Sequence, residues 1–148
     1  MRAVVQRVSS ASVRVKGETV GSIGPGLCAF VGATHSDRPA DAERMARRLW
    51  GLRIFGDDAG LTNRSAEDLG LEVLVVSQFT VYADTSRGRR PSFAGAAAPE
   101  KAEPLVDALV AGLRALGAAG ATGRFRAAME VELVNDGPFT VVVETGQA

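Results

Sequence analysis

Two short stretches of the sequence contain side chains that could take part in chemistry. The first is Ser77-Gln78-Phe79-Thr80, which directly follows the apolar residues 73–76. The apolar run predicts a buried strand, on which Ser77 and Phe79 would point to one side. Gln78 and Thr80 would point to the other, and their polar groups would need hydrogen-bonding partners. Two interpretations are therefore open: a polar strand end that is satisfied by its neighbours, or the floor of an active site.

A nucleophilic serine or threonine in this stretch would need a base within hydrogen-bonding reach, and a third group to orient that base. The only histidine, His35, lies in a polar loop pattern, and the only cysteine, Cys28, lies in an apolar run where it should be a small buried hydrophobic residue. These two residues exclude an internal disulfide and a Cys/His metal cluster. No Gly-x-Ser-x-Gly sequence surrounds Ser77, and no phosphate-binding Gly-rich motif occurs. The sequence therefore lacks the base that a conventional side-chain mechanism would need, and we expect neither a metal nor a cofactor.

The second stretch is Asn135-Asp136-Gly137-Pro138-Phe139-Thr140, near the end of the chain. It predicts a hairpin turn between two closing strands, over 129–134 and 139–144. The bond between Gly137 and Pro138 could also be cis, but only about one X-Pro bond in twenty is cis in folded proteins. The residues by themselves therefore do not predict the cis form.

The elements that must position these stretches follow from the hydrophobic periodicity. Alternating and apolar residues predict strands over 1–9, 13–15, 19–23 and 27–31, joined by turns into an antiparallel meander. Helical stripes predict one helix over about 39–51 and another over about 99–116, where Pro104 should kink the first turns or delay the start. We further predict a short strand over 53–55 and a loop over 117–123. Strands grouped around two helices without regular alternation indicate an α+β fold.

The composition limits the classes of protein to which the chain can belong. A length of 148 residues predicts a single domain over 1–148. Acidic and basic residues number 17 each, so no overall charge attracts nucleic acid or membrane, and any RNA contact must use a local patch. No signal-peptide pattern and no apolar run of membrane-spanning length occur. We therefore expect a cytoplasmic protein that does not attach to a membrane.

Together, the two stretches resemble the motifs of the D-aminoacyl-tRNA deacylase family. Further segments that resemble this family are Gln6-Arg7-Val8 with Ala11-x-Val13, Arg89-Arg90-Pro91-Ser92-Phe93, and Thr122-Gly123-Arg124-Phe125. The resemblance covers essentially the whole chain. Phe139 departs from the family, whose Gly-Pro motif usually continues with Val, and Pro104 inside the second helix is also atypical. The fold that we predict is α+β, with a largely antiparallel, curved, barrel-like sheet and two main helices.

The resemblance implies hydrolysis of the ester that joins a D-amino acid to the terminal adenosine of tRNA, carried out by a homodimer. Gly137 and Pro138 would form a Gly-cis-Pro motif that inserts into the partner subunit's active site. Their backbone carbonyls would face the α-amino group of the substrate, so that an L side chain would meet a rigid wall. Glycine has no Cβ and escapes this filter. Removal of glycine mischarged onto alanine tRNA is therefore an expected second activity.

The resemblance also places the Ser77-Gln78-Phe79-Thr80 stretch beneath the scissile ester as the expected catalytic residues. A backbone N–H there, of Phe79 or Thr80, would hold the developing oxyanion. The neighbouring ribose hydroxyl of the substrate can position or activate water, which would explain why the protein has no base near this stretch. Thr80 as a covalent nucleophile is the alternative, although no base is evident near it.

The expected partner is the acceptor end of aminoacyl-tRNA, held by phosphate contacts from Arg87, Arg89 and Arg90. The same arginines could instead form a solvated loop, the usual role of a charged run. Two other classes of function are open: a tRNA- or nucleic-acid-binding module without hydrolysis, and an ordinary serine esterase for small substrates. The intact motifs argue against the first class, and the missing base near Ser77 argues against the second.

Overall fold

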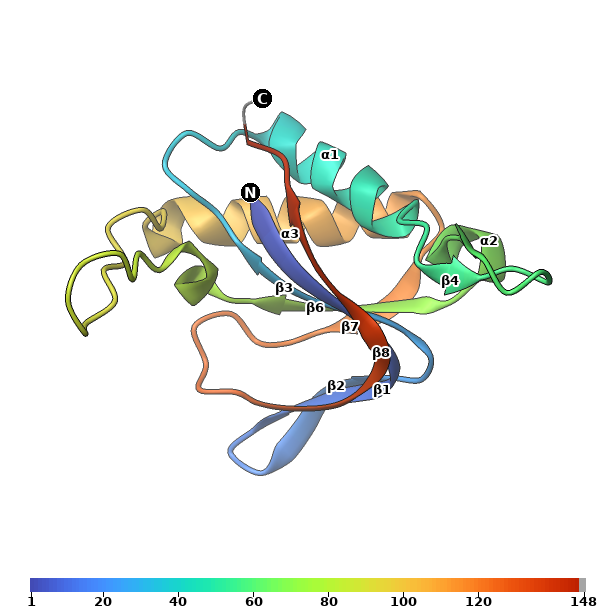
Figure 1. Ribbon diagram of the computed structural model, residues 1–148. Helices are drawn as coiled ribbons and strands as arrows, with labels where there is room; N and C mark the ends of the chain where they lie inside the picture. The colour runs from blue at the N-terminus through green and yellow to red at the C-terminus, as the bar shows by residue number, and fades with distance from the viewer. Residues whose placement is uncertain (147–148) are drawn as a thin grey trace.

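The computed structural model describes residues 1–146 and is built around one curved, six-stranded sheet (Figure 1). The strand order is β2-β1-β3-β6-β7, and β8 lies along β1. The strands are β1 (Arg2–Val15), β2 (Glu18–Ile23), β3 (Gly26–Gly32), β6 (Glu72–Ser77), β7 (Ala119–Thr122) and β8 (Glu130–Glu144). The pairs around β1 are antiparallel, whereas β6 runs parallel to both β3 and β7.

The outer strands β2 and β7 approach each other and nearly close the sheet into a barrel. A Cβ atom added to Gly21 of β2 would lie 2.5 Å from the carbonyl oxygen of Thr122 in β7, so the two backbones are in contact. The predicted α+β fold with a curved, barrel-like sheet is therefore confirmed. The loop predicted over 117–123 is wrong, because β7 occupies most of it. A Cβ at Gly120 would lie 1.9 Å from the carbonyl oxygen of Val73, so the small residues there mark close backbone packing.

Two long helices cover one face of the sheet, and both agree with the predicted ranges. They are α1 (Pro39–Trp50) and α3 (Pro99–Ala115), which lie above the strands in Figure 1. Pro104 lies inside α3 at an exposed position. The smaller elements are β4 (Phe55–Gly56), β5 (Thr62–Arg64), α2 (Ala66–Leu69) and the 3₁₀ helix η1 (Phe79–Tyr82). None of the helices in residues 1–146 is long and apolar enough to cross a membrane.

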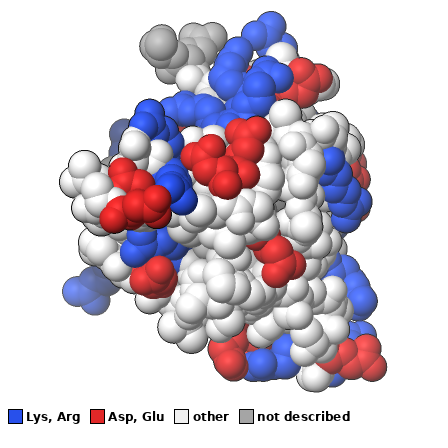
Figure 2. All heavy atoms as spheres, turned by 90° about the vertical axis from the view of Figure 1, so that its right-hand side faces the viewer, with Lys and Arg blue, Asp and Glu red and all other residues white. Residues whose placement is uncertain are grey.

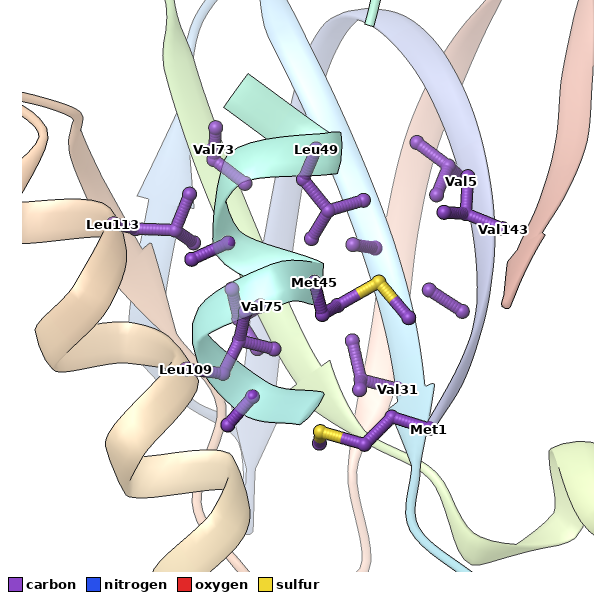
Figure 3. Close-up of a cluster of buried hydrophobic side chains, with 14 of the residues drawn as sticks. Met1, Val5, Val31, Met45, Leu49, Val73, Val75, Leu109, Leu113 and Val143 are labelled. Carbon is purple, nitrogen blue, oxygen red and sulfur yellow. The ribbon is translucent and has the colours of Figure 1, made fainter. Parts of the chain in front are cut away.

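The strands at the centre of the sheet are buried on both faces. One face packs under the helices, where residues such as Met45, Leu49 and Leu109 meet Val73 and Val75 (Figure 3). The other face lines the barrel interior, formed by Val8, Val13, Ile23, Cys28, Leu74 and Val76. This double burial explains why 73–76 read as an unbroken apolar run. Burial also raises the pKa of the Cys28 thiol to about 12, as expected for a buried hydrophobic residue.

The C-terminal hairpin predicted from the second stretch is wrong. β8 is one continuous strand that follows β1 along almost its whole length, so both halves of β8 pair with β1 and not with each other. Gln6 pairs with Thr140 while Val8 pairs with Asn135, so residues 136–139 bulge out opposite the single residue Arg7. Asn, Gly and Pro signal either a turn or a bulge, and only the pairing partner decides between them.

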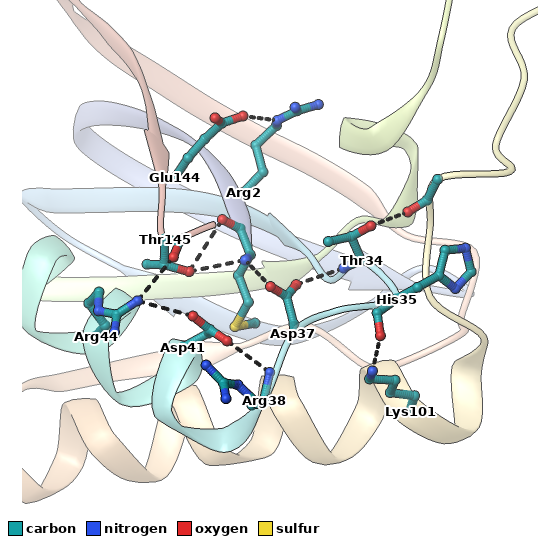
Figure 4. Close-up of polar contacts among 12 residues, drawn as sticks. Arg2, Thr34, His35, Asp37, Arg38, Asp41, Arg44, Lys101, Glu144 and Thr145 are labelled. Carbon is teal, nitrogen blue, oxygen red and sulfur yellow. Dashed lines mark hydrogen bonds and ion pairs between the residues drawn. The ribbon is translucent and has the colours of Figure 1, made fainter. Parts of the chain in front are cut away.

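A buried ion pair joins the start of the chain to the segment that precedes α1. The Met1 ammonium lies 2.7 Å from Asp37 Oδ1, with both side chains almost fully buried, and donates a hydrogen bond to Thr145 Oγ1 at 3.0 Å (Figure 4). Asp37 Oδ2 accepts from the backbone N–H of Thr34 at 2.7 Å. We expect Asp37→Asn to lower the free energy of unfolding by about 3–5 kcal/mol, because the ammonium is left buried without its counterion. Urea denaturation measures this change.

The matched control is Asp58→Asn, which breaks a solvent-exposed ion pair. Asp58 lies 3.2 Å from the Arg64 guanidinium, but its side chain is 95% exposed, so solvent already screens the pair. We expect little change in the urea midpoint of this variant. Equal midpoints for the two variants would show that the buried pair does not stabilise the fold.

Candidate active site

The Ser77–Thr80 stretch straddles the end of a strand and the start of a helix. β6 ends at Ser77, and η1 begins at Phe79, so the predicted alternation of side chains along an extended strand is wrong beyond Ser77. The parallel partner β3 ends at Gly32, next to this point. A Cβ at Gly32 would lie 2.9 Å from the carbonyl oxygen of Gln78. The glycine therefore allows the chain to turn into η1 directly against the sheet.

A pocket of about 610 Å³ opens at this strand end, within the usual size range for small-molecule sites. Its floor includes Ser77, Gln78 and Phe79. One wall comes from the segment 96–99 and the start of α3, and the opposite wall comes from the 125–131 segment that leads into β8. Most of the lining is apolar, with few polar groups placed at the floor. Both interpretations of the stretch find support: three of its residues line the pocket, and the side chains of Gln78 and Thr80 are hydrogen-bonded to each other.

Two backbone N–H groups in this stretch, one on a residue that lines the pocket and one on the next residue, have no acceptor within residues 1–146. They belong to Phe79 and Thr80, the first residues of η1, where a helix supplies no internal partner. The flanking groups are satisfied, since Gln78 N–H donates to the carbonyl of Val31 at 2.8 Å and Val81 N–H donates to that of Gln78 at 3.3 Å. The stretch thus has two backbone donors without an acceptor, and one of them belongs to the pocket-lining residue Phe79.

The hydroxyl groups of the stretch lack a base. Thr80 Oγ1 accepts a hydrogen bond from Gln78 Nε2 at 2.5 Å, and neither end of an amide is basic enough to take a proton. The lone histidine has a structural contact instead: His35 Nε2 lies 2.7 Å from the carbonyl oxygen of Ala94, in the loop beside the pocket. The geometry of the described residues therefore does not supply the base that a nucleophilic Ser77 or Thr80 would need.

The Gly137–Pro138 peptide bond is cis, as the resemblance implies and as the residues by themselves do not predict. Both residues are exposed, on the bulge of β8. The segment is held by Arg7, a half-buried residue of β1 whose guanidinium donates to the carbonyls of Asp136 at 3.1 Å, Gly137 at 3.3 Å and Ile54 at 2.7 Å. The same group forms an ion pair with the Asp136 carboxylate at 3.1 Å.

The bulge has two further contacts that fix its shape. The Arg7 guanidinium carbon lies 4.4 Å from the centre of the Phe139 ring, a cation–π distance. Asn135 Nδ2 donates to the carbonyls of Arg7 at 3.0 Å and Phe139 at 3.1 Å. The unusual Phe139 therefore packs beneath the arginine and against the core, which accommodates its bulk.

One chain does not bring the two stretches together. Neither Gly137 nor Pro138 lines the pocket. Figure 1 shows β8 crossing near the centre of the molecule, whereas η1 and the loop that follows it lie on the left. Arg87, Arg89 and Arg90 do not line the pocket either; they are exposed, in the loop that follows η1.

Several pocket residues are absent from the sequence-based prediction. Those with the largest side chains are Phe93, Val106, Phe125, Arg126 and Met129. Phe93 and Phe125 belong to segments that carry the family resemblance, and that position was the available signal. The alanines of 96–98 also line the pocket, and nothing in their sequence indicated it. Arg7 also belongs to a segment that carries the resemblance, but its contacts could not be predicted, because its partners lie far away in the sequence.

The fold is similar to that of two solved structures. The chain superposes on the c-Myc DNA Unwinding Element Binding Protein with a TM-score of 0.92 and 37% identity, covering 99% of this chain and 100% of that one. A probable eukaryotic D-amino acid tRNA deacylase shares the fold with a TM-score of 0.83 at 15% identity, covering 97% of this chain and 98% of the other. The nearly closed barrel with two covering helices is therefore a known architecture.

Sequence comparisons then identify the family. The family model described as D-Tyr-tRNA(Tyr) deacylase matches residues 4–144. The D-aminoacyl-tRNA deacylase of Streptomyces coelicolor is 58% identical, covering 97% of this chain and 99% of the relative. That of Nocardia farcinica is 57% identical, covering 98% and 100%. The chain belongs to the D-aminoacyl-tRNA deacylase family, which confirms the resemblance and the prediction that it is an enzyme of this family, a carboxylic ester hydrolase.

Proposed function

We propose that the chain hydrolyses the ester between a D-amino acid and the terminal adenosine of tRNA, and releases free tRNA and the D-amino acid. Water adds to the ester carbonyl, the bond from the carbonyl carbon to the ribose oxygen breaks, and that oxygen leaves with a proton. The observation that supports this most directly is the pair of N–H groups of Phe79, which lines the pocket, and of the adjacent Thr80, neither of which has an acceptor within residues 1–146. One such donor typically contributes about 3 kcal/mol of transition-state stabilisation.

The missing base is consistent with catalysis assisted by the substrate. The ribose hydroxyl next to the scissile ester positions the attacking water, while the enzyme contributes the backbone donors and excludes other arrangements. In this mechanism Thr80 holds the end of β6 through Gln78 and forms no covalent intermediate.

We expect Thr80→Val to keep kcat within about fivefold of the original value, because the variant loses only one neutral hydrogen bond. Single-turnover hydrolysis of a D-aminoacyl-tRNA measures this. The control is Ser77→Ala, which removes the other hydroxyl of the floor and should have an equally small effect. Trapping of an acyl group on Thr80 by rapid quench and mass spectrometry would contradict the assignment.

The chiral filter is proposed to come from a second copy of the chain. The site of one chain lacks the Gly137–Pro138 wall, and the carbonyl of Gly137 is exposed and fixed by Arg7. β8 pairs only with β1 within residues 1–146, so its outer edge is open to a partner, with Val134 and Val142 more than half exposed. Figure 2 shows the right-hand side of Figure 1, where a broad uncharged area is bordered mostly by charged side chains. A homodimer that buries this side would complete each pocket.

A backbone wall distinguishes substrates by the position of Cβ, so it should accept glycine, which has no Cβ, as well as D-amino acids. An L side chain would clash with the wall, a D side chain would point away from it, and glycine would pass. Glycine mischarged onto alanine tRNA is therefore proposed as a second substrate. A cytoplasmic location, where charged tRNA is used, accords with this activity.

The loop arginines are proposed to bind phosphates of the acceptor end. We expect the double variant Arg89→Ala, Arg90→Ala to raise KM and to reduce the slope of log affinity against log salt by about 0.7 for each lost phosphate contact. Binding of uncharged tRNA at several salt concentrations measures the slope. The control is Arg47→Ala on the exposed face of α1, which should leave the slope unchanged.

One assay separates this function from the two other classes. The enzyme is incubated with matched D- and L-aminoacyl-tRNA, and with a small carboxylic ester. Selective release from the D form supports the proposal. Binding without release would instead indicate a nucleic-acid-binding module, and release from the small ester alone would indicate an ordinary esterase.

A further inference from the structure

Two phenylalanine rings at the rim of the pocket are exposed to solvent and have no role in the proposed chemistry. Phe79 is 55% and Phe93 is 40% exposed, whereas the other four phenylalanines are buried or half-buried. Their ring centroids are 5.2 Å apart, with an angle of 72° between the planes. In such an edge-to-face pair the two rings form a corner, and solvent reaches the ring faces that the contact leaves open. We call this pair the aromatic corner.

The corner is held in place by backbone contacts on both sides. Phe79 begins η1 at the pocket floor. The segment that carries Phe93 is closed by a double backbone hydrogen bond between Asp84 and Ser92, at 2.7 and 2.9 Å. On its other side, Thr34 Oγ1 donates to the carbonyl of Gly95 at 2.6 Å. Two exposed aromatic side chains are thus fixed at one place, although each would gain free energy from burial.

Positive charge surrounds the corner. The loop between the two rings carries Arg87, Arg89 and Arg90, all exposed, and Arg126 lines the same pocket as the two rings. The one acidic residue of the loop, Asp84, accepts a hydrogen bond from the backbone of Ser86 at 2.9 Å. Figure 1 shows this loop projecting from the fold beside η1. An aromatic face next to unpaired cations is the arrangement by which proteins bind single-stranded nucleic acid, with bases stacked on rings and phosphates on the cations.

We propose that the aromatic corner is a second nucleotide subsite, in which the base of the nucleotide preceding the terminal adenosine stacks on Phe79 and Phe93. This inference rests on the proposed function, since the pocket itself would hold the terminal adenosine and its aminoacyl ester. The stacking accepts any base, because every base has a flat π-face. The surrounding arginines favour a nucleotide over the side chain of the bound amino acid, which carries no phosphate.

The experiment varies two properties of the substrate independently: the size of the amino acid, and whether the ester is attached to RNA or to free adenosine. The substrates are D-tyrosyl and D-alanyl esters of an acceptor-stem RNA, and the same two esters of free adenosine. The variants are Phe93→Leu, which keeps the apolar volume but loses the ring, and Phe93→Tyr, which keeps the ring. We expect Phe93→Leu to raise KM about tenfold for both RNA esters and far less for both adenosine esters. The Tyr variant should behave as the original enzyme.

Other patterns would overturn the inference. A loss confined to the tyrosyl esters would mean that the corner binds the amino-acid side chain. Dissociation of a dimer by Phe93→Leu in analytical ultracentrifugation, with the KM change disappearing at high enzyme concentration, would mean that it packs against a second copy. Equal KM values for Phe93→Leu and the original enzyme on the RNA esters would remove any role in RNA binding.

A binding measurement keeps this result separate from the hydrolytic function. An uncharged acceptor RNA carries 2-aminopurine at the position before the terminal adenosine, and its fluorescence should be quenched by the original enzyme and by Phe93→Tyr but not by Phe93→Leu. If the original enzyme hydrolyses no D-aminoacyl RNA but shows this pattern, the proposed function is wrong and the subsite stands. Absence of quenching by the original enzyme, with RNA bound, overturns the subsite whatever the hydrolytic result.

Discussion

Replacing the backbone N–H of the residue that holds the oxyanion with an ester oxygen is expected to lower kcat about 100- to 1,000-fold. The two positions to test are Phe79 and Thr80, because the N–H groups of both lack an acceptor within residues 1–146 at the start of η1. An α-hydroxy acid introduced at either position removes one donor and keeps the side chain. KM should change little, because the donor acts on charge that develops only in the transition state. Single-turnover rates with a D-aminoacyl-tRNA measure the effect.

The comparison of the two positions also identifies the donor, since only one N–H needs to point at the oxyanion. Phe79→Ala is the matched control, because it removes the side chain and keeps the N–H. It should leave kcat nearly unchanged, whatever it does to RNA affinity. Rates within a few-fold of the original for both ester replacements would mean that the oxyanion is stabilised elsewhere, and the backbone mechanism would have to be abandoned.

Arg7→Ala is expected to lower kcat/KM for D-aminoacyl-tRNA about 100-fold and to narrow the difference between D and L substrates. The guanidinium holds the carbonyls of Asp136 and Gly137 and the ring of Phe139 in one arrangement. Charge-assisted hydrogen bonds of this kind contribute about 1.5–3 kcal/mol each. Without them, the proposed wall would move, and a displacement of about 1 Å at a reacting group can cost 100-fold in rate. Parallel kinetics on D- and L-aminoacyl-tRNA measure both changes.

Arg14→Ala is a close control, because Arg14 lies on the same strand and also reaches across to β8. Its guanidinium is 3.4 Å from Glu132, far from the bulge, and its side chain is 35% exposed. This variant should keep the D/L ratio unchanged. Arg7→Lys tests whether the planar guanidinium is required, since an ammonium group cannot donate to several carbonyls in the same geometry. If Arg7→Ala preserves the D/L ratio while lowering only the urea midpoint, Arg7 stabilises the fold without positioning the wall.

Much of the fold was accessible from the sequence because the signals concerned were local. The apolar stripes of α1 and α3 and the buried run before Ser77 depend on periodicities of a few residues, and these ranges agree with the structure. The predicted meander is wrong, because the strands predicted over 1–9 and 13–15 form one strand, β1, which lies between β2 and β3 in the strand order. The prediction was also wrong where small or turn-forming residues are compatible with two structures, a loop or a closely packed strand, and a hairpin turn or a bulge. Gly120 belongs to a strand pressed against the backbone of Val73, and the Asn-Gly-Pro segment is a bulge of β8.

The chemistry of the site was accessible only in part. The residue types sufficed to show that no conventional base accompanies Ser77 or Thr80, and the two motifs sufficed to assign the family. They could not show that the helix start at Phe79 leaves two N–H groups free, because that depends on where β6 stops. Nor could they show that Arg7 holds Gly137, since the two residues are 130 positions apart and meet only through the pairing of β1 with β8.

The sequence by itself therefore determined the fold class, the family and the absence of a conventional nucleophile with its base. The tertiary structure decided which backbone groups lack an acceptor, which side chains surround the pocket, and that Gly137 and Pro138 of the same chain do not line it. The physical reason is the same in each case. Periodicity and motif chemistry are properties of neighbouring residues, whereas free donors, clamped carbonyls and exposed rings depend on contacts between segments that are distant along the chain.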